Sequence, residues 1–383
     1  MKHPKHHIFQ QTPESLRDWC VERGMKPFRA GQILEWVYQK GVADPRAMTN
    51  LSKAERELLA AEMTFLSGPT VAHQLATDGT QKLLIEWPDD AELKTNAEEA
   101  RIDPGNRLPI LNLGNIYSNT ARQTECVMIP ATEKGTDGLP VRRTACISSQ
   151  VGCAVGCKFC ATGLGGLDGN LSEGRIVEQV WRLARLDGVG RISNVVFMGM
   201  GEPLANFKPV TRAIRTMAAD WGLGISARKI TVSTVGMHKA IERLADEMDL
   251  PITLALSLHA PNDALRRELI PWAEFTTIEQ LLAACRKWFE KTGREITLEY
   301  ILLRGVNDRP EHAAELAGVA KQLRANVNLI RYNEVAGTPF SRPGTDDVLE
   351  FQRILRSRGV NTHIRASRGR DIAAACGQLR HEH

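Results

Sequence analysis

Residues 146–160 read CISSQVGCAVGCKFC and contain four of the chain's eight cysteines. Three of them, Cys153, Cys157 and Cys160, form a C-x3-C-x2-C motif, and Cys146 stands seven residues before it. Thiolates bind soft metals, and such short spacings let one loop surround one centre. A structural zinc site would normally need a second, separated pair of ligands, and the chain has no further C-x2-C pair. Three thiolates suit a [4Fe–4S] cluster whose fourth iron is left for a substrate.

Phe159 gives the motif the form C-x3-C-x-Φ-C, in which Φ is aromatic. This form is similar to that of the radical S-adenosylmethionine (SAM) enzymes. The resemblance implies that SAM chelates the open iron through its amino and carboxylate groups and receives one electron from the cluster. The spacing alone leaves two alternatives open, a different metal and buried thiols that bind nothing.

The composition is that of an ordinary globular chain with a sizeable core. Of 383 residues, 43% are hydrophobic and 25% charged. No apolar run approaches the roughly 20 residues of a membrane span, and MKHPKHHIFQ lacks the apolar core of a signal peptide. Clustered cysteines in a long chain favour a reducing compartment over a disulfide framework. We therefore expect a cytoplasmic protein that makes no membrane contact.

The net charge of +4 is modest, but its distribution is uneven. Residues 351–383 hold seven arginines against Asp371 and Glu382, and residues 86–103 hold seven acids against Lys94 and Arg101. A polyanion such as RNA would meet the basic C-terminal part. A solvated charged surface is the alternative.

Residues 1–68 are predicted to form a helical accessory domain that binds RNA. Thr12 followed by Pro13 is a helix start, and Ser52 is another. Apolar residues recur at helical spacing in FRAGQILEWVYQKGV, which also carries aromatic and basic side chains. That mixture is found in small nucleic-acid-binding domains, but for each single residue, packing in a small core is the more common explanation.

Residues 69–141 are predicted to form a linking segment of strands and loops. Asp78-Gly79 is a hairpin turn between HQLAT and KLLIEW. Residues 88–122 are rich in Pro, Asp, Asn and Gly and indicate an insertion without regular structure, and 131–141 is a second loop.

From residue 142 to 383, strands and helices alternate. The predicted strands are 143–149, 192–199, 229–235, 252–259, 295–303, 327–333 and 361–367, and the predicted helices are 172–187, 206–221, 237–248, 277–291, 310–324 and 346–358. The strands are apolar and β-branched, as in a buried parallel sheet. Six βα units followed by a strand predict an α/β fold, a partial (β/α)6 barrel, whose chemistry lies at the carboxyl ends of the strands.

Polar residues and glycines follow several of these strands and are candidates for binding SAM. They are Gly201 and Glu202 in GMGEP, Ser233, the triplet Ser257, Leu258 and His259, and Asn333. The glycines permit close backbone approach, and Glu202 could accept from an ammonium group. The alternative for GMGEP is a plain turn. Packing alone does not readily explain why polar residues follow several strands at the same end of the predicted barrel.

Four cysteines lie outside the cluster region. Cys376 in DIAAACGQL is on sequence grounds either a buried small hydrophobic residue or a functional thiol. Cys20, Cys126 and Cys285 have no metal spacing, and we assign them to packing.

Taken together, these stretches resemble the radical SAM adenine methyltransferases of RNA, the RlmN type. The matching stretches are FRAGQILEWVY, CISSQVGCAVGCKFCATG, FMGMGEPLAN, SLHAPND, VNLIRYN and RGRDIAAACGQL, in the family's order. The 88–122 and 131–141 loops lack a good counterpart. Some motifs (GEPLAN, NLIRYN) lean toward a sister group, the Cfr type.

The resemblance implies a reaction that uses two SAM molecules per turnover. One SAM methylates the tail cysteine that matches Cys376, and a second is cleaved to a radical that takes hydrogen from the new methyl group. The resulting methylene radical adds to an adenine carbon. The thiolate matching Cys146 then forms a disulfide with Cys376 and frees the base, while the glutamate matching Glu125 removes the ring proton.

The resemblance also implies the substrates and partners. C2-specific members act on one adenosine of 23S rRNA and on the adenosine 3′ of the anticodon in some tRNAs, whereas the Cfr type methylates C8 of the same rRNA adenosine and confers antibiotic resistance. We expect the C2 activity, a one-electron reductant such as flavodoxin, and a monomer. An iron–sulfur or RNA-binding protein without turnover, and a different radical SAM reaction, are the competing hypotheses.

Overall fold

The computed structural model describes residues 1–89, 122–136 and 138–379. Its centre is one ten-stranded sheet with the order β1-β2-β3-β4-β7-β8-β9-β10-β11-β12. These strands are β1 (Thr70–Leu75), β2 (Gln81–Glu86), β3 (Gln123–Pro130), β4 (Arg143–Cys146), β7 (Asn194–Phe197), β8 (Ile230–Thr234), β9 (Thr253–Ser257), β10 (Ile296–Leu302), β11 (Ala325–Arg331) and β12 (Thr362–Arg365).

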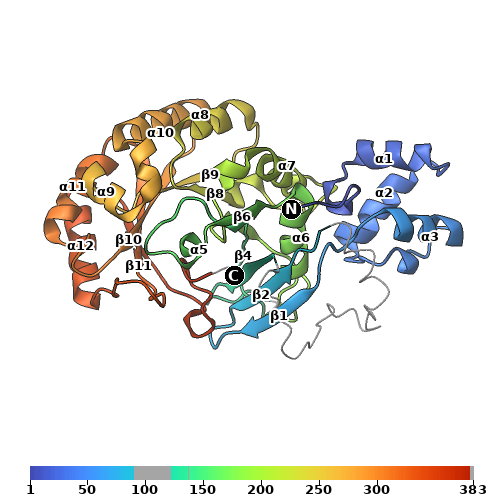
Figure 1. Cartoon of the computed structure of the whole chain (residues 1–383), viewed down its shortest axis with the longest axis horizontal. Coiled ribbons are helices and arrows are strands. Elements are labelled where there is room, and N and C mark those ends of the chain that lie inside the picture. The colour runs from blue at the N-terminus through green and yellow to red at the C-terminus, as the bar shows by residue number, and fades with distance from the viewer. Residues whose placement is uncertain (90–121, 137, 380–383) are drawn as a thin grey trace.

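From β4 to β12 every neighbouring pair of strands is parallel. The crossover helices lie on the outside of the curved sheet (Figure 1). They are α6 (Glu173–Leu183), α7 (Phe207–Ala218), α8 (His238–Glu247), α10 (Ile278–Thr292), α11 (Pro310–Ala320) and α12 (Thr345–Ser357). Each predicted strand and helix of residues 142–383 is present, and the predicted partial (β/α)6 barrel is confirmed.

Short elements in the loops after the strands were not predicted. They are the hairpin of β5 (Gln150–Gly152) and β6 (Leu167–Asn170), α5 (Ala161–Leu164) and α9 (Asp263–Leu269). Each is too short to show a period in the sequence, and tertiary contacts hold it in place. All of them surround the carboxyl ends of the barrel strands.

The first three strands extend the barrel sheet in antiparallel fashion, because β3 pairs with both β2 and β4. The predicted hairpin is confirmed: β1 and β2 pair antiparallel, and Gly79 in their turn has a φ of 81°. The predicted 88–122 insertion lies almost entirely outside the described residues. Residues 131–136 and 138–141 form the predicted loop, which an isolated bridge between Lys134 and Pro140 closes.

The N-terminal region consists of α1 (Pro13–Glu22), α2 (Arg29–Leu34) with a following π-helical turn (Glu35–Gln39), and α3 (Lys53–Glu62). The predicted caps are confirmed, since Thr12 accepts from Ser15 N and Ser52 from Glu55 N. Aromatic rings fill the interface with the barrel: Phe9 packs on Tyr38 and on Trp181 of α6. Packing therefore accounts for much of the aromatic content of this region.

Helix α6 lies between the sheet and the N-terminal helices, and all eleven of its residues are buried. Its buried polar side chains are paired: Glu178 accepts from Ser67 Oγ at 2.7 Å and lies 3.0 Å from His7 Nε2. Arg182 Nε donates to Glu178 at 2.8 Å. This network joins the N-terminal region to the barrel.

The chain after β12 crosses from one edge of the sheet to the other. Thr77 N, beside the β1–β2 turn, donates to Asp371 Oδ2 of the C-terminal segment at 2.9 Å. In the opposite direction, Gly369 N of the C-terminal segment donates to Asp78 Oδ2 at 3.0 Å. The C-terminal segment thus reaches the β1–β2 turn and ends beside β4 and α5 (Figure 1). In the described part of the chain no helix is both long and apolar enough to cross a membrane.

Candidate active site

The cysteine loop occupies the mouth of the barrel between β5 and α5. Lys158 N donates to Leu269 O at 3.0 Å, which fixes the loop to the end of α9. The Cys153, Cys157 and Cys160 side chains pack on an apolar cluster that includes Ile270.

Burial, with smaller contributions from Glu202 and Cys160, raises the pKa of the Cys153 thiol to about 12. Burial, followed by Cys160 and Cys153, raises the pKa of Cys157 well above its usual value. Across the described residues, no three His, Cys, Asp or Glu side chains stand in the geometry of a metal site. The donor set itself is three soft sulfur atoms on one loop, each within electrostatic range of the others. That chemistry fits an iron–sulfur cluster.

The GMGEP turn after β7 packs tightly on the segment that follows β4. A Cβ on Gly201, whose φ is 97°, would lie 2.6 Å from Gln150 Cβ, and one on Gly199 would lie 2.6 Å from Ile147 O. Glu202 is buried, and its carboxylate accepts from Leu204 N at 3.0 Å and Val235 N at 2.8 Å. Burial raises the pKa of Glu202, and these hydrogen bonds oppose the rise. The carboxylate therefore ties the turn to the end of β8.

The predicted residues of β8 and β9 lie side by side. Ser233 Oγ and Ser257 Oγ are 3.2 Å apart across neighbouring strands. Leu258 is buried behind them, and its backbone N–H donates to Glu299 O at 3.0 Å.

His259 has a φ of 59°, unusual for a residue other than glycine. Its Nδ1 accepts from Ile301 N at 3.1 Å, so the neutral ring carries its proton on Nε2. Burial, followed by Arg266, lowers the pKa of His259 to about 3 and keeps the ring neutral. The ring meets Phe159 edge-on at 5.1 Å, so the end of β9 touches the cysteine loop.

The tail carries Cys376 to the cysteine loop. Ala161 N donates to Gly377 O at 2.8 Å, and Thr162 Oγ1 donates to Leu379 O. Asn333 Nδ2 donates to Cys376 O at 3.2 Å, while Asn333 Oδ1 accepts from Arg342 Nη1 at 3.0 Å. The predicted strand-end residue Asn333 thus holds the backbone of the tail cysteine.

The structure brings Cys146 and Cys376 together although 230 positions separate them. Both thiols are free, and each lies within electrostatic range of Arg365 at the end of β12. Burial, followed by the neighbouring Cys376, raises the pKa of Cys146 to about 12, and Arg365 opposes the rise. Burial also raises the pKa of Cys376, again against Arg365. The tail cysteine is therefore part of the site's interior.

Glu125 projects from β3 toward the same interior. Val127 of β3 pairs with Lys82 of β2 on one side and with Cys146 of β4 on the other, so these three side chains lie on the same face of the sheet. Glu125 lies two residues before Val127 on β3 and therefore shares that face. Lys82 Nζ lies 2.6 Å from Glu125 Oε1, and it also donates to Ala373 O of the tail at 3.4 Å. The carboxylate is thus held beside the segment that carries Cys376.

Sequence reasoning missed three charged residues of the interior: Lys82, Glu299 and Arg365. Glu299 is 3% exposed on β10 and accepts from Asn328 Nδ2 at 3.1 Å. A carboxylate within the apolar stretch ITLEYIL was a signal that could have been used. Arg365 belongs by sequence to the basic C-terminal part, but in the structure it lies within electrostatic range of Glu299 and of the Cys146 and Cys376 thiols. Cys20, Cys126 and Cys285 are fully buried, in agreement with packing roles.

Two family models match the chain. The ribosomal RNA large subunit methyltransferase N-terminal domain matches residues 7–64, and the radical SAM superfamily matches residues 147–317. The barrel and its cysteine loop therefore define a protein of the radical SAM superfamily.

Relatives match over almost the whole length. The dual-specificity RNA methyltransferase RlmN of Dichelobacter nodosus is 39% identical over 383 residues, covering 98% of this chain and 94% of that protein. The Probable dual-specificity RNA methyltransferase RlmN of Rhodopirellula baltica is 40% identical over 377 residues, covering 98% and 91%. A crystal structure of a radical SAM methyltransferase from Sphaerobacter thermophilus superposes with a TM-score of 0.84 at 38% identity, covering 98% and 99%. The chain belongs to the RlmN family of RNA methyltransferases.

Proposed function

We propose that this protein methylates C2 of a specific adenosine in 23S rRNA, and also the adenosine 3′ of the anticodon in tRNAs. The observation that carries the proposal is the position of Cys376, whose backbone is bound by Asn333 and whose neighbour Gly377 accepts from Ala161, directly after the cysteine loop. A tail thiol at the mouth of a radical SAM barrel suits a methyl carrier. C8 methylation of the same rRNA adenosine, as in the Cfr type, is the second candidate.

The cofactors we propose are a [4Fe–4S] cluster held by Cys153, Cys157 and Cys160, and two SAM molecules per turnover. The cluster would supply the electron that makes bound SAM a source of a carbon radical. Gly201, Glu202, Ser233, the triplet 257–259 and Asn333 would line the SAM site. A one-electron reductant such as flavodoxin, a monomeric state and a cytoplasmic location complete the proposal. The clustering of cysteines in a long chain supports a reducing compartment.

In this proposal the chain's own residues divide the work. Cys376 would take a methyl group, and this group would lose one hydrogen atom to the carbon radical that SAM supplies. The remaining CH2 bonds to the adenine carbon, so that an S–CH2–C link joins protein and RNA, and the surplus electron would return to the cluster. Glu125 removes the ring proton. Cys146 then attacks the sulfur of Cys376: a disulfide forms, the sulfur–carbon bond breaks, and its electron pair leaves with the methyl carbon, which takes up a proton. Lys82 Nζ lies 2.6 Å from Glu125 Oε1 and holds the carboxylate in position for this role.

Mass mapping of rRNA and tRNA tests this proposal. Cells that lack the modification are complemented with the wild type, with Cys376→Ala, or with Cys20→Ala, in which another buried thiol is removed away from the site. We expect 2-methyladenosine with the wild type and Cys20→Ala and none with Cys376→Ala. 8-Methyladenosine would select the second candidate. Methylation by Cys376→Ala would overturn the methyl-carrier role.

A further inference from the structure

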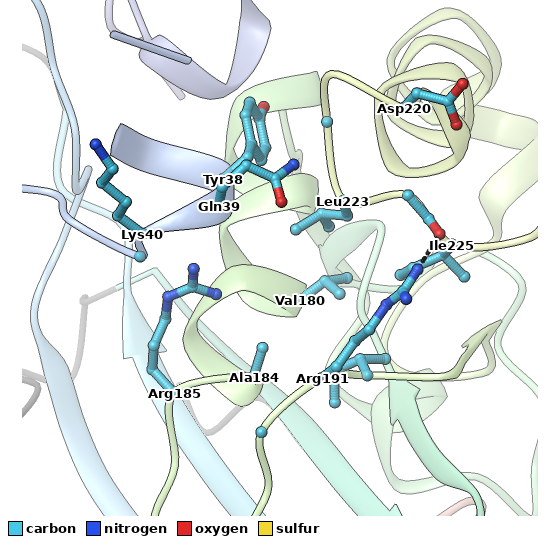
Figure 2. Close-up of a pocket in the computed structure, with 15 residues that line it drawn as sticks. Tyr38, Gln39, Lys40, Val180, Ala184, Arg185, Arg191, Asp220, Leu223 and Ile225 are labelled. Atoms are coloured by element: carbon cyan, nitrogen blue, oxygen red, sulfur yellow. Dashed lines mark hydrogen bonds between the residues drawn. The ribbon is translucent and has the colours of Figure 1, made fainter. Parts of the chain in front are cut away.

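A second hollow lies between the N-terminal helices and the barrel, with a volume of about 560 Å³. One wall is the end of the π-helical turn, from Tyr38 to Gly41, and the other is the end of α6 with the segments 190–192 and 220–225 (Figure 2). The volume falls in the range of small-molecule sites, roughly 300–1,000 Å³.

This cavity is separate from the candidate active site. Its segments 190–192 and 222–225 lead into β7, which starts at Asn194, and β8, which starts at Ile230. They therefore lie at the amino ends of these strands. The cysteine loop and the GMGEP turn lie at the carboxyl ends, on the opposite side of the barrel. Nothing in the proposed methylation uses this hollow.

Arg185 gives the cavity a positive charge that no described carboxylate balances. Its guanidinium stacks on the Trp181 ring at 4.1 Å and donates to Trp181 O at 3.1 Å and Val37 O at 3.4 Å. Its Nε is buried without a hydrogen-bond partner, and burial lowers the pKa of Arg185 to about 10. A half-buried cation without an acid is electrostatically costly, and a bound anion would remove that cost.

Arg191 adds a second cation on the same wall as Arg185. It donates to Gly224 O, the contact drawn in Figure 2, and it forms no ion pair with a described carboxylate. Asp220 is the acidic residue of the described lining, and Figure 2 shows its carboxylate directed away from both arginines. Lys40 is already paired with Glu35 at 3.1 Å. The two arginines therefore set the charge of the cavity.

The remaining lining is suited to a flat, partly apolar group. Ala184 and Leu223 supply accessible apolar surface, with Val180 and Ile225 buried in the same lining. The exposed Gln39 directs its amide toward the hollow in Figure 2. Guanidinium groups match phosphate oxygens in geometry and charge. We propose that the cavity binds a nucleotide, with its phosphate between Arg185 and Arg191 and its base against the apolar wall. The source is either a free nucleotide or one unit of an RNA chain.

Calorimetric titration of the full-length protein tests the site with three probes: uridine 5′-monophosphate, uridine and a uridine tetranucleotide. The variants are Arg185→Gln and Arg191→Gln, with Arg358→Gln, an exposed arginine of the barrel, as the control of equal charge. Arg185 also contacts Trp181 and Val37, so thermal unfolding checks that variant. Arg191 is exposed, and its variant decides the question if Arg185→Gln does not fold.

We expect the monophosphate to bind at least about tenfold more tightly than uridine, and each cavity variant to weaken it by about tenfold, as for one charge-assisted hydrogen bond. Arg358→Gln should bind as the wild type does. Binding of the tetranucleotide alone, weakened by the same variants, would support the site and assign it to an RNA chain. Three results would overturn the proposal. They are equal affinities for uridine and its monophosphate, unchanged affinity for the monophosphate in both cavity variants, and no binding of either phosphate probe.

Discussion

Lys82 Nζ and Glu125 Oε1 lie 2.6 Å apart inside the barrel, and their side chains are only 9% and 10% exposed. The two residues come from neighbouring antiparallel strands, and Lys82 also reaches the carbonyl oxygen of Ala373. Removing one member of such a buried pair leaves the other charge without its partner.

We expect Lys82→Met to lower the free energy of unfolding by about 3 kcal/mol, because the carboxylate of Glu125 stays buried. The double variant Lys82→Met/Glu125→Gln should recover most of that loss. Urea unfolding of the wild type, both single variants and the double variant measures the coupling. Additive losses in the double variant would show that the pair contributes little to stability.

The buried Glu178 predicts a dependence of stability on pH. Burial would raise its pKa, but Arg182, His7 and Ser67 outweigh burial and lower the pKa from 4.5 to about 2. The folded form therefore holds the ionised carboxylate more strongly than the unfolded chain does. This contribution, about 3 kcal/mol, is present above pH 4.5 and is lost as the pH falls toward 2.

The Glu178→Gln variant checks this expectation, because it should flatten the fall in unfolding free energy between pH 4.5 and pH 2. Glu350→Gln, which removes a carboxylate from the surface, is the matched control. An unchanged slope in Glu178→Gln would contradict the role of this residue.

Gly201 should tolerate no side chain. Its φ is 97°, and a Cβ would lie 2.6 Å from Gln150 Cβ, whereas Gly188 has a φ of 73° with open space around it. We expect Gly188→Ala to cost about 1 kcal/mol through backbone strain alone and Gly201→Ala about 1–3 kcal/mol more through the clash. Chemical denaturation of both variants measures the difference. Equal losses would mean that the start of β5, at Gln150, shifts to accept the methyl group.

Asn333 should control how firmly the tail is held. Its amide donates to Cys376 O and accepts from Arg342, so Asn333→Ala removes the side-chain hydrogen bond that holds the tail carbonyl, while Arg342 Nη1 keeps its hydrogen bond to Tyr332 O. We expect hydrogen exchange in residues 374–379 to rise by about tenfold, which corresponds to one such hydrogen bond. Asn361→Ala, at an exposed asparagine, should leave that exchange unchanged. Unchanged exchange in Asn333→Ala would show that Ala161 and Thr162 suffice to hold the tail.

The barrel could be predicted because its parallel strands are buried on both faces and read as apolar, β-branched runs between helical periods. The cysteine loop could be predicted because its three thiols are close in sequence, so that their spacing already specifies one loop. The β1–β2 hairpin could be predicted because its turn signal, Asp78-Gly79, consists of two residues adjacent in the sequence.

Contacts between distant segments could not be predicted in the same way. The Lys82–Glu125 pair depends on the register of β2 and β3, and a shift of one strand by one residue would have put the two side chains on opposite faces of the sheet. Arg365 looked like a surface residue because its own strand, THIR, is short and half-buried, and only the barrel geometry turns it inward. The proximity of Cys146 and Cys376 came from the family resemblance, since neither spacing nor composition links them.

The hydrogen bond between Gly369 of the C-terminal segment and Asp78 of the β1–β2 turn also sets an order of assembly. The β1–β2 turn is translated before the barrel strands, whereas its partner Gly369 and the segment bearing Cys376 follow all of those strands in the chain. This contact can therefore form only after every strand of the barrel has been made. A growing chain can contain the cysteine loop before it contains Cys376, so the two sulfur centres of the site come together only after β12 has been translated.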